Sequence, residues 1–90
     1  MPADQQGGDL KPVSPARVAE ELRSLSEKRI KGELRTDEYE HRFSRMITEL
    51  RDRRIDGSRA ESLATLTPLL QEGVVSAEDW RRLTRQLGLA

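Results

Sequence analysis

Apolar residues recur at helical spacing in four separate stretches of this chain. The clearest stretch lies near the middle, where five apolar side chains fall within roughly a 100° arc of a helix. Acidic residues open this stretch and arginines close it, in the order that the helix dipole favours. The pattern predicts a long amphipathic helix with one buried face, formed by Tyr39, Phe43, Met46, Ile47 and Leu50.

The stretch before it begins with several N-terminal helix signals. Ser14 is a predicted N-cap, and Pro15 suits the first helical position. Val13 and Val18 have the spacing of a hydrophobic staple. Gly32 supplies the left-handed residue that ends many helices. We therefore predict a first helix between Ser14 and Gly32.

Two shorter helices are predicted after the turn signal Asp56-Gly57. Ser58 and Glu61 have the spacing of a capping box at the start of the third helix. Pro68 removes one backbone donor, so it should kink this helix or restart it with Thr67 as a new cap. The fourth helix is expected from Ser76 to the region of Gly88, and it is shorter than the second.

The two halves of the chain repeat each other at an offset of 41 residues, the separation of Gly32 from Gly73. Tyr39 then aligns with Trp80, and each aromatic follows a pair of acidic residues. Such agreement favours two copies of one helical hairpin, each unable to bury its apolar stripe alone. Convergent helix punctuation would produce part of the same match, so both origins stay open. The identities are Ala19, Glu20, Leu22, Leu25 and Gly32 with Ala60, Glu61, Leu63, Leu66 and Gly73.

These patterns predict an all-α protein of four helices, arranged as two tandem αα-hairpins that pack together through short links. Residues 1–12 are polar and read as a flexible tail, and residues 13–90 as one domain, with hairpin repeats at 14–56 and 58–90. The helix-ending glycines are Gly32, Gly57 and Gly73. The predicted core consists of Val18, Leu22, Leu25, Leu34, Tyr39, Phe43, Met46, Ile47, Leu50, Leu63, Leu66, Leu70, Val75, Trp80 and Leu83.

Two residues on the apolar arcs have competing interpretations. Arg29 lies in the centre of the first helix's arc, where we expect a packed stem and a guanidinium that reaches solvent. Trp80 has core spacing, but protein interfaces also favour tryptophan. We place it in the core.

Length and composition favour self-association. A chain of 90 residues with only 34% hydrophobic content has a small core, and without cysteine it has no disulfides to reinforce it, so we expect marginal stability. A second chain would supply more buried surface, so a homo-oligomer, most simply a dimer, is expected. The lack of cysteine fits a reducing compartment, and neither a signal peptide nor a membrane-spanning run is apparent. We therefore expect a cytoplasmic protein without a membrane partner.

The charges point to proteins rather than nucleic acids as partners. Sixteen basic and sixteen acidic residues cancel, whereas a nucleic-acid binder usually shows a basic excess. A local surplus remains on the last helix, where Arg81, Arg82 and Arg85 crowd around Glu78. These arginines would meet an acidic protein or a phosphate, or simply keep the exposed face soluble.

No residue set predicts catalysis, a cofactor or a metal. His41 is the only histidine, and it falls opposite the apolar arc of its helix, so it should face water. The acidic pairs Asp37-Glu38 and Glu78-Asp79 suit the first turn of a helix and lack the pattern of a calcium loop. An enzyme is therefore the least favoured function.

The links between the helices carry a family resemblance. The first link runs through Gly32, Leu34, Asp37, Glu38 and Tyr39, and the second through Gly73, Val75, Ser76, Glu78, Asp79 and Trp80. Both resemble the SHOCT family of short bacterial domains, which form a helical hairpin around a G-x-I-T-x-E-E-F link. The first copy departs from that pattern because Arg35 stands where the family has Thr or Ser. The resemblance implies oligomerisation or protein binding.

The expected function is therefore that of a non-enzymatic interaction or oligomerisation module. Surplus apolar helix surface would be buried against a second copy or a partner, with arginines at the rim. The candidate interface residues are Arg81, Arg82, Arg85, Leu87 and Leu89. The alternative is a nucleic-acid-associated accessory or regulatory protein that uses the same arginines.

Overall fold

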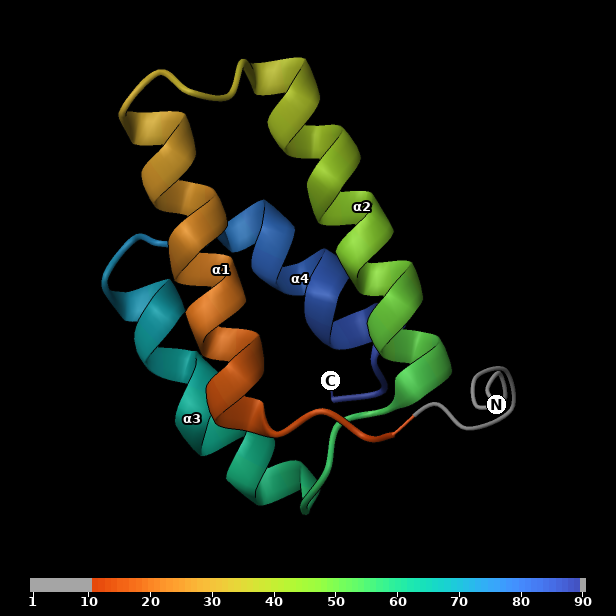
Figure 1. The fold of residues 1–90 in the computed structure, drawn as a ribbon. Helices are drawn as coiled ribbons and strands as arrows, with labels where there is room; N and C mark the ends of the chain where they lie inside the picture. Colours follow the sequence, from red (N-terminus) through yellow and green to blue (C-terminus); the bar gives the residue numbers. More distant parts are fainter. Residues whose placement is uncertain (1–10, 90) are drawn as a thin grey trace, which may run out of the picture.

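The computed structural model describes residues 11–89, which form four α-helices joined by short links (Figure 1). The helices are α1 (Pro15–Ile30), α2 (Thr36–Arg53), α3 (Arg59–Gln71) and α4 (Ala77–Gln86). The predicted all-α class is confirmed. Most of the predicted tail, residues 1–12, lies outside the described residues.

Three of the four helices begin with the predicted serine caps. The hydroxyl oxygens of Ser14 and Ser76 each accept a hydrogen bond from the backbone N–H three residues later. Ser58 forms the full capping box, because its own N–H also donates to the Glu61 carboxylate at 2.7 Å. At the start of α2, Arg35 has no side-chain acceptor, so only Glu38 contributes, by accepting from the Arg35 N–H at 2.9 Å.

The links that follow α1 and α3 have the same hydrogen-bond pattern. Gly32 and Gly73 adopt φ values of +80° and +79°, which residues with a Cβ atom rarely adopt. In each link, the N–H groups of the next two residues both bond to one carbonyl, that of Lys28 in the first and Leu69 in the second. These two carbonyls are 41 residues apart, so the structure repeats with the same offset as the sequence.

The end of α2 differs from the prediction. Gly57 was expected to end this helix, but α2 ends at Arg53 and Arg54 takes the positive φ of +72°. Gly57, at φ +104°, lies in the turn immediately before the cap of α3. The intervening residues are held in place by Val13, whose N–H and C=O bond to Arg54 and Asp56 at 2.9 and 2.7 Å.

The two hairpins stack in the same orientation. In Figure 1, α1 and α2 form a front layer, and α3 and α4 lie behind them. Helix α1 packs mainly on α3, and α2 crosses α4, whereas α3 and α4 contact each other little. The bridge between Val13 and Ile55 is parallel, so the chain enters α1 and α3 in the same direction. The predicted pairing within the second hairpin is therefore only partly realised.

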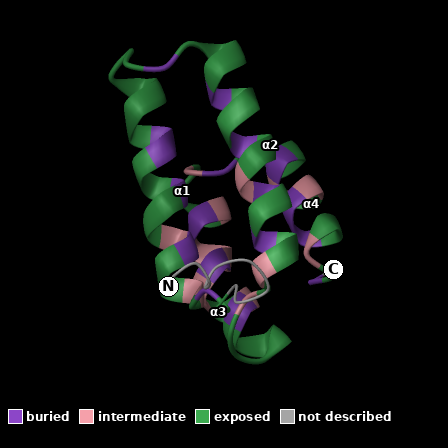
Figure 2. Ribbon diagram, turned by 45° about the vertical axis from the view of Figure 1, so that its right-hand side comes forward, coloured by how far each residue is buried: buried purple, intermediate pink, exposed green. Residues whose placement is uncertain are grey.

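The core lies between these layers, and Figure 2 marks the buried residues of each helix in purple. Eleven of the fifteen predicted core residues are buried: Val18, Leu22, Leu25, Leu34, Tyr39, Phe43, Ile47, Leu50, Leu66, Val75 and Leu83. Met46, Leu63 and Trp80 are only partly buried at the edge of this core.

The prediction for the end of α3 was wrong by one residue. Leu69 is fully buried, whereas Leu70, the predicted core residue, is only half-buried and lies outside the core cluster. The two side chains are about 100° apart on the helix. The position of α1 against α3, rather than the local sequence, decides which of them faces inward.

Pro68 does not divide α3. The helix continues through it to Gln71. The restart with Thr67 as a cap was wrong, because the Thr67 hydroxyl donates back to the carbonyl of Leu63. A threonine can satisfy its hydroxyl in this way inside a helix, so it does not have to cap a new one.

Candidate protein-docking groove

The predicted arginine patch on α4 is partly used inside the chain. Arg81 and Arg85 are exposed. Arg82 instead reaches α2, with its Nη2 3.0 Å from Oε1 of Glu40 and its guanidinium carbon 4.8 Å from the ring centroid of Phe43. Arg82 therefore links the two hairpins, and its role at an interface stays a prediction.

The C-terminal leucines also differ from the prediction. Leu87 is half-buried against the core, and Leu89 is 7% exposed and belongs to the core. The chain turns back after α4, so that the N–H of Leu89 donates to the carbonyl of Thr84 at 2.7 Å. The Leu89 carbonyl accepts from Nε of Arg59 at 3.0 Å. Leu89 therefore contributes to the packing of the chain on itself, and its role at an interface stays a prediction.

Arginines cover both ends of an aromatic pair at the centre of the stack. The rings of Tyr39 and Phe43 stack with centroids 6.0 Å apart. The Arg29 guanidinium lies 4.3 Å from the Tyr39 centroid, so this exposed arginine does more than reach for solvent. Arg82 covers Phe43 from the opposite helix pair. This arrangement joins α1, α2 and α4 without creating an accessible site.

Asp79 is the acidic group buried beside Arg82. Only 8% of this residue is exposed, and its Oδ1 lies 3.5 Å from Nη2 of Arg82. Burial, followed by the negative charge of Glu40, raises the pKa of the Asp79 carboxyl, although Arg82 and Ser76 oppose the shift. The pKa of Tyr39 is also raised, mainly by burial and then by Asp79. Both shifts follow from the packing of α4 on α2.

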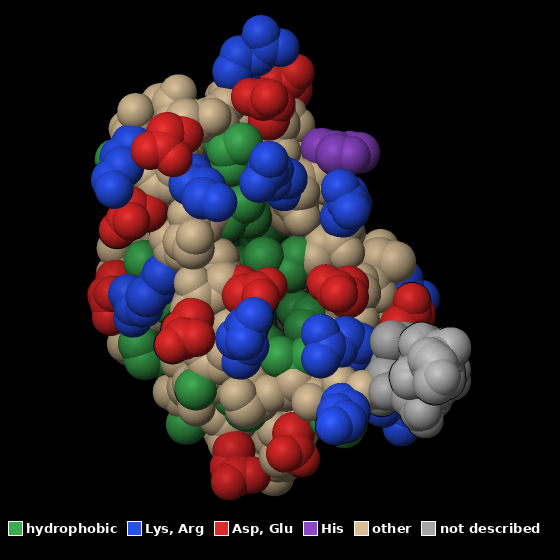
Figure 3. Space-filling model, in the orientation of Figure 1, with side chains coloured by type: hydrophobic (Ala, Val, Ile, Leu, Met, Phe, Trp, Pro, Cys, Tyr) green, Lys and Arg blue, Asp and Glu red, His purple; other side chains and the backbone are tan. Residues whose placement is uncertain are grey.

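A wide groove of about 980 Å³ runs between α1 and α2 on the face away from the second hairpin. Its lining includes Leu25 from α1 and Met46 from α2. Figure 3 shows hydrophobic side chains along the middle of this face, with charged side chains on both sides. An apolar floor between charged rims is typical of a surface that receives another protein element.

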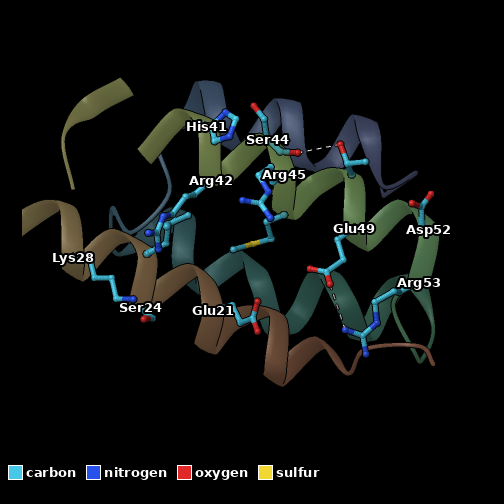
Figure 4. A pocket seen from close by; sticks show the side chains of 13 residues that line it. Glu21, Ser24, Lys28, His41, Arg42, Ser44, Arg45, Glu49, Asp52 and Arg53 are labelled. Carbon is cyan, nitrogen blue, oxygen red and sulfur yellow. Dashed lines mark hydrogen bonds and ion pairs between the residues drawn. The ribbon is translucent and has the colours of Figure 1, made fainter. Parts of the chain in front are cut away.

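One end of the groove carries free positive charge. Lys28 of α1 and Arg42 and Arg45 of α2 line it, and Figure 4 shows them on facing helices. Within residues 11–89, none of these three side chains forms an ion pair. Because each charge stays in contact with solvent, together they attract an anionic group that approaches between the helices.

The other end is mixed in charge and internally neutralised. Glu49 pairs with Arg53 at 3.9 Å, and Glu21 pairs with Arg17 at 3.2 Å. Asp52 also lines this end. The groove is therefore polarised along its length, with the surplus of positive charge near the link between α1 and α2.

This groove was not apparent from the sequence. Arg42, Arg45 and Arg53 share one flank of α2 with Glu38 and Glu49, and the four-residue spacing of Glu38–Arg42 and Glu49–Arg53 by itself indicates a mutually paired, solvated face. The Glu49–Arg53 pair forms, but Arg42 has no ion-pair partner within the described part of the chain. Lys28 on α1 also contributes to this positive end of the groove. Its contribution is not apparent from the sequence, because it depends on α1 and α2 lying side by side.

Among residues 11–89, no three His, Cys, Asp or Glu side chains come close enough together to bind a metal ion. None of the helices in this range combines the length and the apolarity needed to cross a membrane.

Comparisons with protein-family models, with curated proteins and with solved structures gave no match. The resemblance to the SHOCT family therefore stays a prediction based on the two links.

Proposed function

We propose that this chain is a non-enzymatic protein-interaction module that binds its partner in the α1–α2 groove. The observation that carries the proposal is the apolar floor of Leu25 and Met46 beside three cations that lack ion-pair partners within residues 11–89. A partner would bury the floor and neutralise the cations at the same time. A cytoplasmic setting agrees with the absence of cysteine from the sequence.

The dimensions of the groove suit a protein element better than a small molecule. Small-molecule sites usually enclose most of the ligand and place a few polar groups around it. Here the lining residues extend from Glu21 to Lys28 on α1 and from His41 to Arg53 on α2, which matches the helix-in-groove mode of recognition. Leu25 and Met46 would be the apolar contacts, and methionine adapts readily to different partner side chains.

Site-specific photo-crosslinking in the host tests this proposal. A crosslinking residue at Ser24, which lines the groove, should capture a partner protein. The same residue at Glu78, an exposed position on α4, is the matched control and should capture much less. Light scattering at micromolar concentration reports in parallel whether the partner is a second copy. A strict monomer without groove-specific crosslinks would argue against the proposal.

The alternative, a nucleic-acid-associated protein, has less support than the groove. Of its three arginines, Arg82 is held by Glu40 and Asp79, which leaves only Arg81 and Arg85 exposed on α4. A salt titration of binding to duplex DNA separates the two functions, since phosphate contacts weaken steeply as salt rises. Absence of binding at low salt would eliminate the alternative.

A further inference from the structure

The α1–α2 groove has an equivalent in the second hairpin, and that equivalent is filled. Shifted by 41 residues, the groove residues Leu25 and Lys28 correspond to Leu66 and Leu69 on α3. Arg42 corresponds to Leu83 on α4. These three leucines are fully buried, because the first hairpin lies on them. The same face of a repeated hairpin is thus covered in the second copy and open in the first.

The stacking of the hairpins indicates what shape the open face accepts. Helix α1 packs along α3 and enters in the same direction, as the parallel bridge between Val13 and Ile55 shows. By analogy, the open face of the first hairpin would receive a helix that lies beside α1 and buries apolar side chains on the half-buried Met46 and on the 7% of Leu25 that remains exposed. An amphipathic helix of a partner has this shape.

The residues that differ between the two faces indicate the partner's charge. Where the second hairpin has Leu69 and Leu83, the first has Lys28 and Arg42. A wholly apolar helix would leave these cations desolvated and unpaired, which is costly. A helix with carboxylates at the matching positions would pair them instead.

The polar contacts between the hairpins lead to the same conclusion. Two ion pairs join the hairpins: Glu72 of the second hairpin pairs with Arg23 at 2.7 Å, and Arg82 of the second hairpin pairs with Glu40 at 3.0 Å. On the open face, the residues equivalent to Glu72 and Arg82 are Lys31 and His41. Lys31 pairs with Glu27 at 3.5 Å but carries the charge opposite to that of Glu72, so an acidic residue of the partner suits this position better than an arginine such as Arg23.

A second copy of this chain does not meet these requirements. In a continued stack, its second hairpin would face the groove, and Arg81 would take the place that Glu40 has in the first hairpin. Arg81 would then approach His41, close to Lys28 and Arg42, where the stack within the chain places Glu40 beside Arg82. Positive charges that face each other across an interface disfavour association.

We infer that the groove binds an acidic amphipathic helix of a different protein, with carboxylates opposite Lys28, Arg42 and Arg45 and an apolar stripe on Leu25 and Met46. This inference rests on the proposed function and specifies the partner's chemistry. It explains why the positive charge of the groove remains unpaired among residues 11–89 although the chain as a whole is neutral.

Two designed peptides of about 18 residues test the inference, a length that spans about five helical turns. Both carry the same apolar stripe, flanked by glutamates in one peptide and by lysines in the other. Fluorescence anisotropy with the full chain should give an affinity on the order of 10–100 µM for the acidic peptide and at least about tenfold weaker binding for the basic one. Binding of the acidic peptide should weaken as salt is raised.

Matched variants locate the binding site. The triple variant Lys28→Gln, Arg42→Gln, Arg45→Gln should weaken binding of the acidic peptide about tenfold. The control variant Arg54→Gln, Arg81→Gln, Arg85→Gln removes the same charge from exposed positions elsewhere and should change binding less than about twofold. Circular dichroism melts verify that both variants fold; if the triple variant does not, Lys28→Gln alone replaces it, with Arg81→Gln as its control.

Several results would overturn the inference. Equal binding of the two peptides, or equal binding by the triple variant and the parent, would remove the role of the groove cations. Self-association blocked by the triple variant would identify a second copy as the occupant. Groove-specific crosslinks to a partner without any binding of the acidic peptide would leave the proposed function standing and refute the acidic helix alone.

Discussion

The burial of Leu69 provides a sharp test of the fold, because its neighbour Leu70 is a matched control. Both side chains have the same size and occupy adjacent positions near the end of α3. Leu69 is 0% exposed in the core, whereas Leu70 is half-buried outside the core cluster. Leu69→Ala should therefore destabilise the protein much more than Leu70→Ala.

The expected difference can be estimated from the burial. Truncation of a fully buried leucine costs about 2–5 kcal/mol, from the lost transfer free energy and the cavity that remains. A half-buried leucine at a surface loses less apolar area, about 1 kcal/mol. Domains of this size have a free energy of unfolding of about 5–10 kcal/mol, so Leu69→Ala removes a large fraction of the total stability. A loss of about 3 kcal/mol corresponds to a decrease in Tm of roughly 12–24 °C.

Urea unfolding followed by circular dichroism measures both variants on one scale. The fluorescence of Trp80 provides a second probe, since it is the only tryptophan and lies at the edge of the core. Coincident transitions would support two-state analysis. Equal losses for the two variants, or a larger loss for Leu70→Ala, would mean that α3 is rotated about its axis relative to α1 and would refute the stacking described above.

Three further predictions concern charge, pH and the links. The double variant Lys28→Leu, Arg42→Leu makes the open groove as apolar as its buried equivalent, so sedimentation should reveal concentration-dependent association that the parent lacks. The raised pKa of Asp79 means that its burial costs no stability at pH values below its unfolded-state pKa and an increasing amount as pH rises through the higher folded-state pKa. Asp79→Asn should thus gain stability relative to the parent as pH rises from below the usual pKa of an aspartate, about 4, through the higher folded-state pKa, as measured in urea titrations. Gly73→Ala should cost about 1–2 kcal/mol in the same assay, because its φ of +79° is strained for alanine.

Each of these predictions has a contrary outcome. A double variant that stays monomeric at all accessible concentrations would mean that the apolar face alone does not drive stacking. A stability of Asp79→Asn that falls relative to the parent as pH rises would show that the pairing with Arg82 outweighs the cost of burial. An unchanged midpoint for Gly73→Ala would mean that the link relaxes to another conformation.

Much of the helix pattern could be predicted from local signals. Ser14, Ser58 and Ser76 cap their helices as expected, because a hydroxyl that accepts a nearby N–H needs no distant partner. Gly32 and Gly73 end helices because their φ values depend on the backbone of the residue itself. Eleven of the predicted core residues are buried, since the helical period of the apolar residues defines an approximate inward face.

The features that could not be predicted depend on contacts between distant parts of the chain. Leu70 was assigned to the core and Leu69 was not, and the part that Leu89 and Arg82 play in packing the chain on itself was not predicted. The environment of each of these side chains is decided by an element far away in the sequence, which periodicity does not identify.

The sequence by itself determined the number of helices, most of their ends and the repetition at 41 residues, because caps, φ values and hydrophobic spacing act within a few residues. Only the tertiary structure decided that the hairpins stack in the same orientation, which covers Leu69 and Leu83 and leaves Lys28 and Arg42 exposed on the equivalent face. The physical reason is that a helical hairpin has two sides on which another hairpin can pack, and the side that is buried depends on contacts between residues about 40 positions apart, as in the Arg82–Glu40 pair.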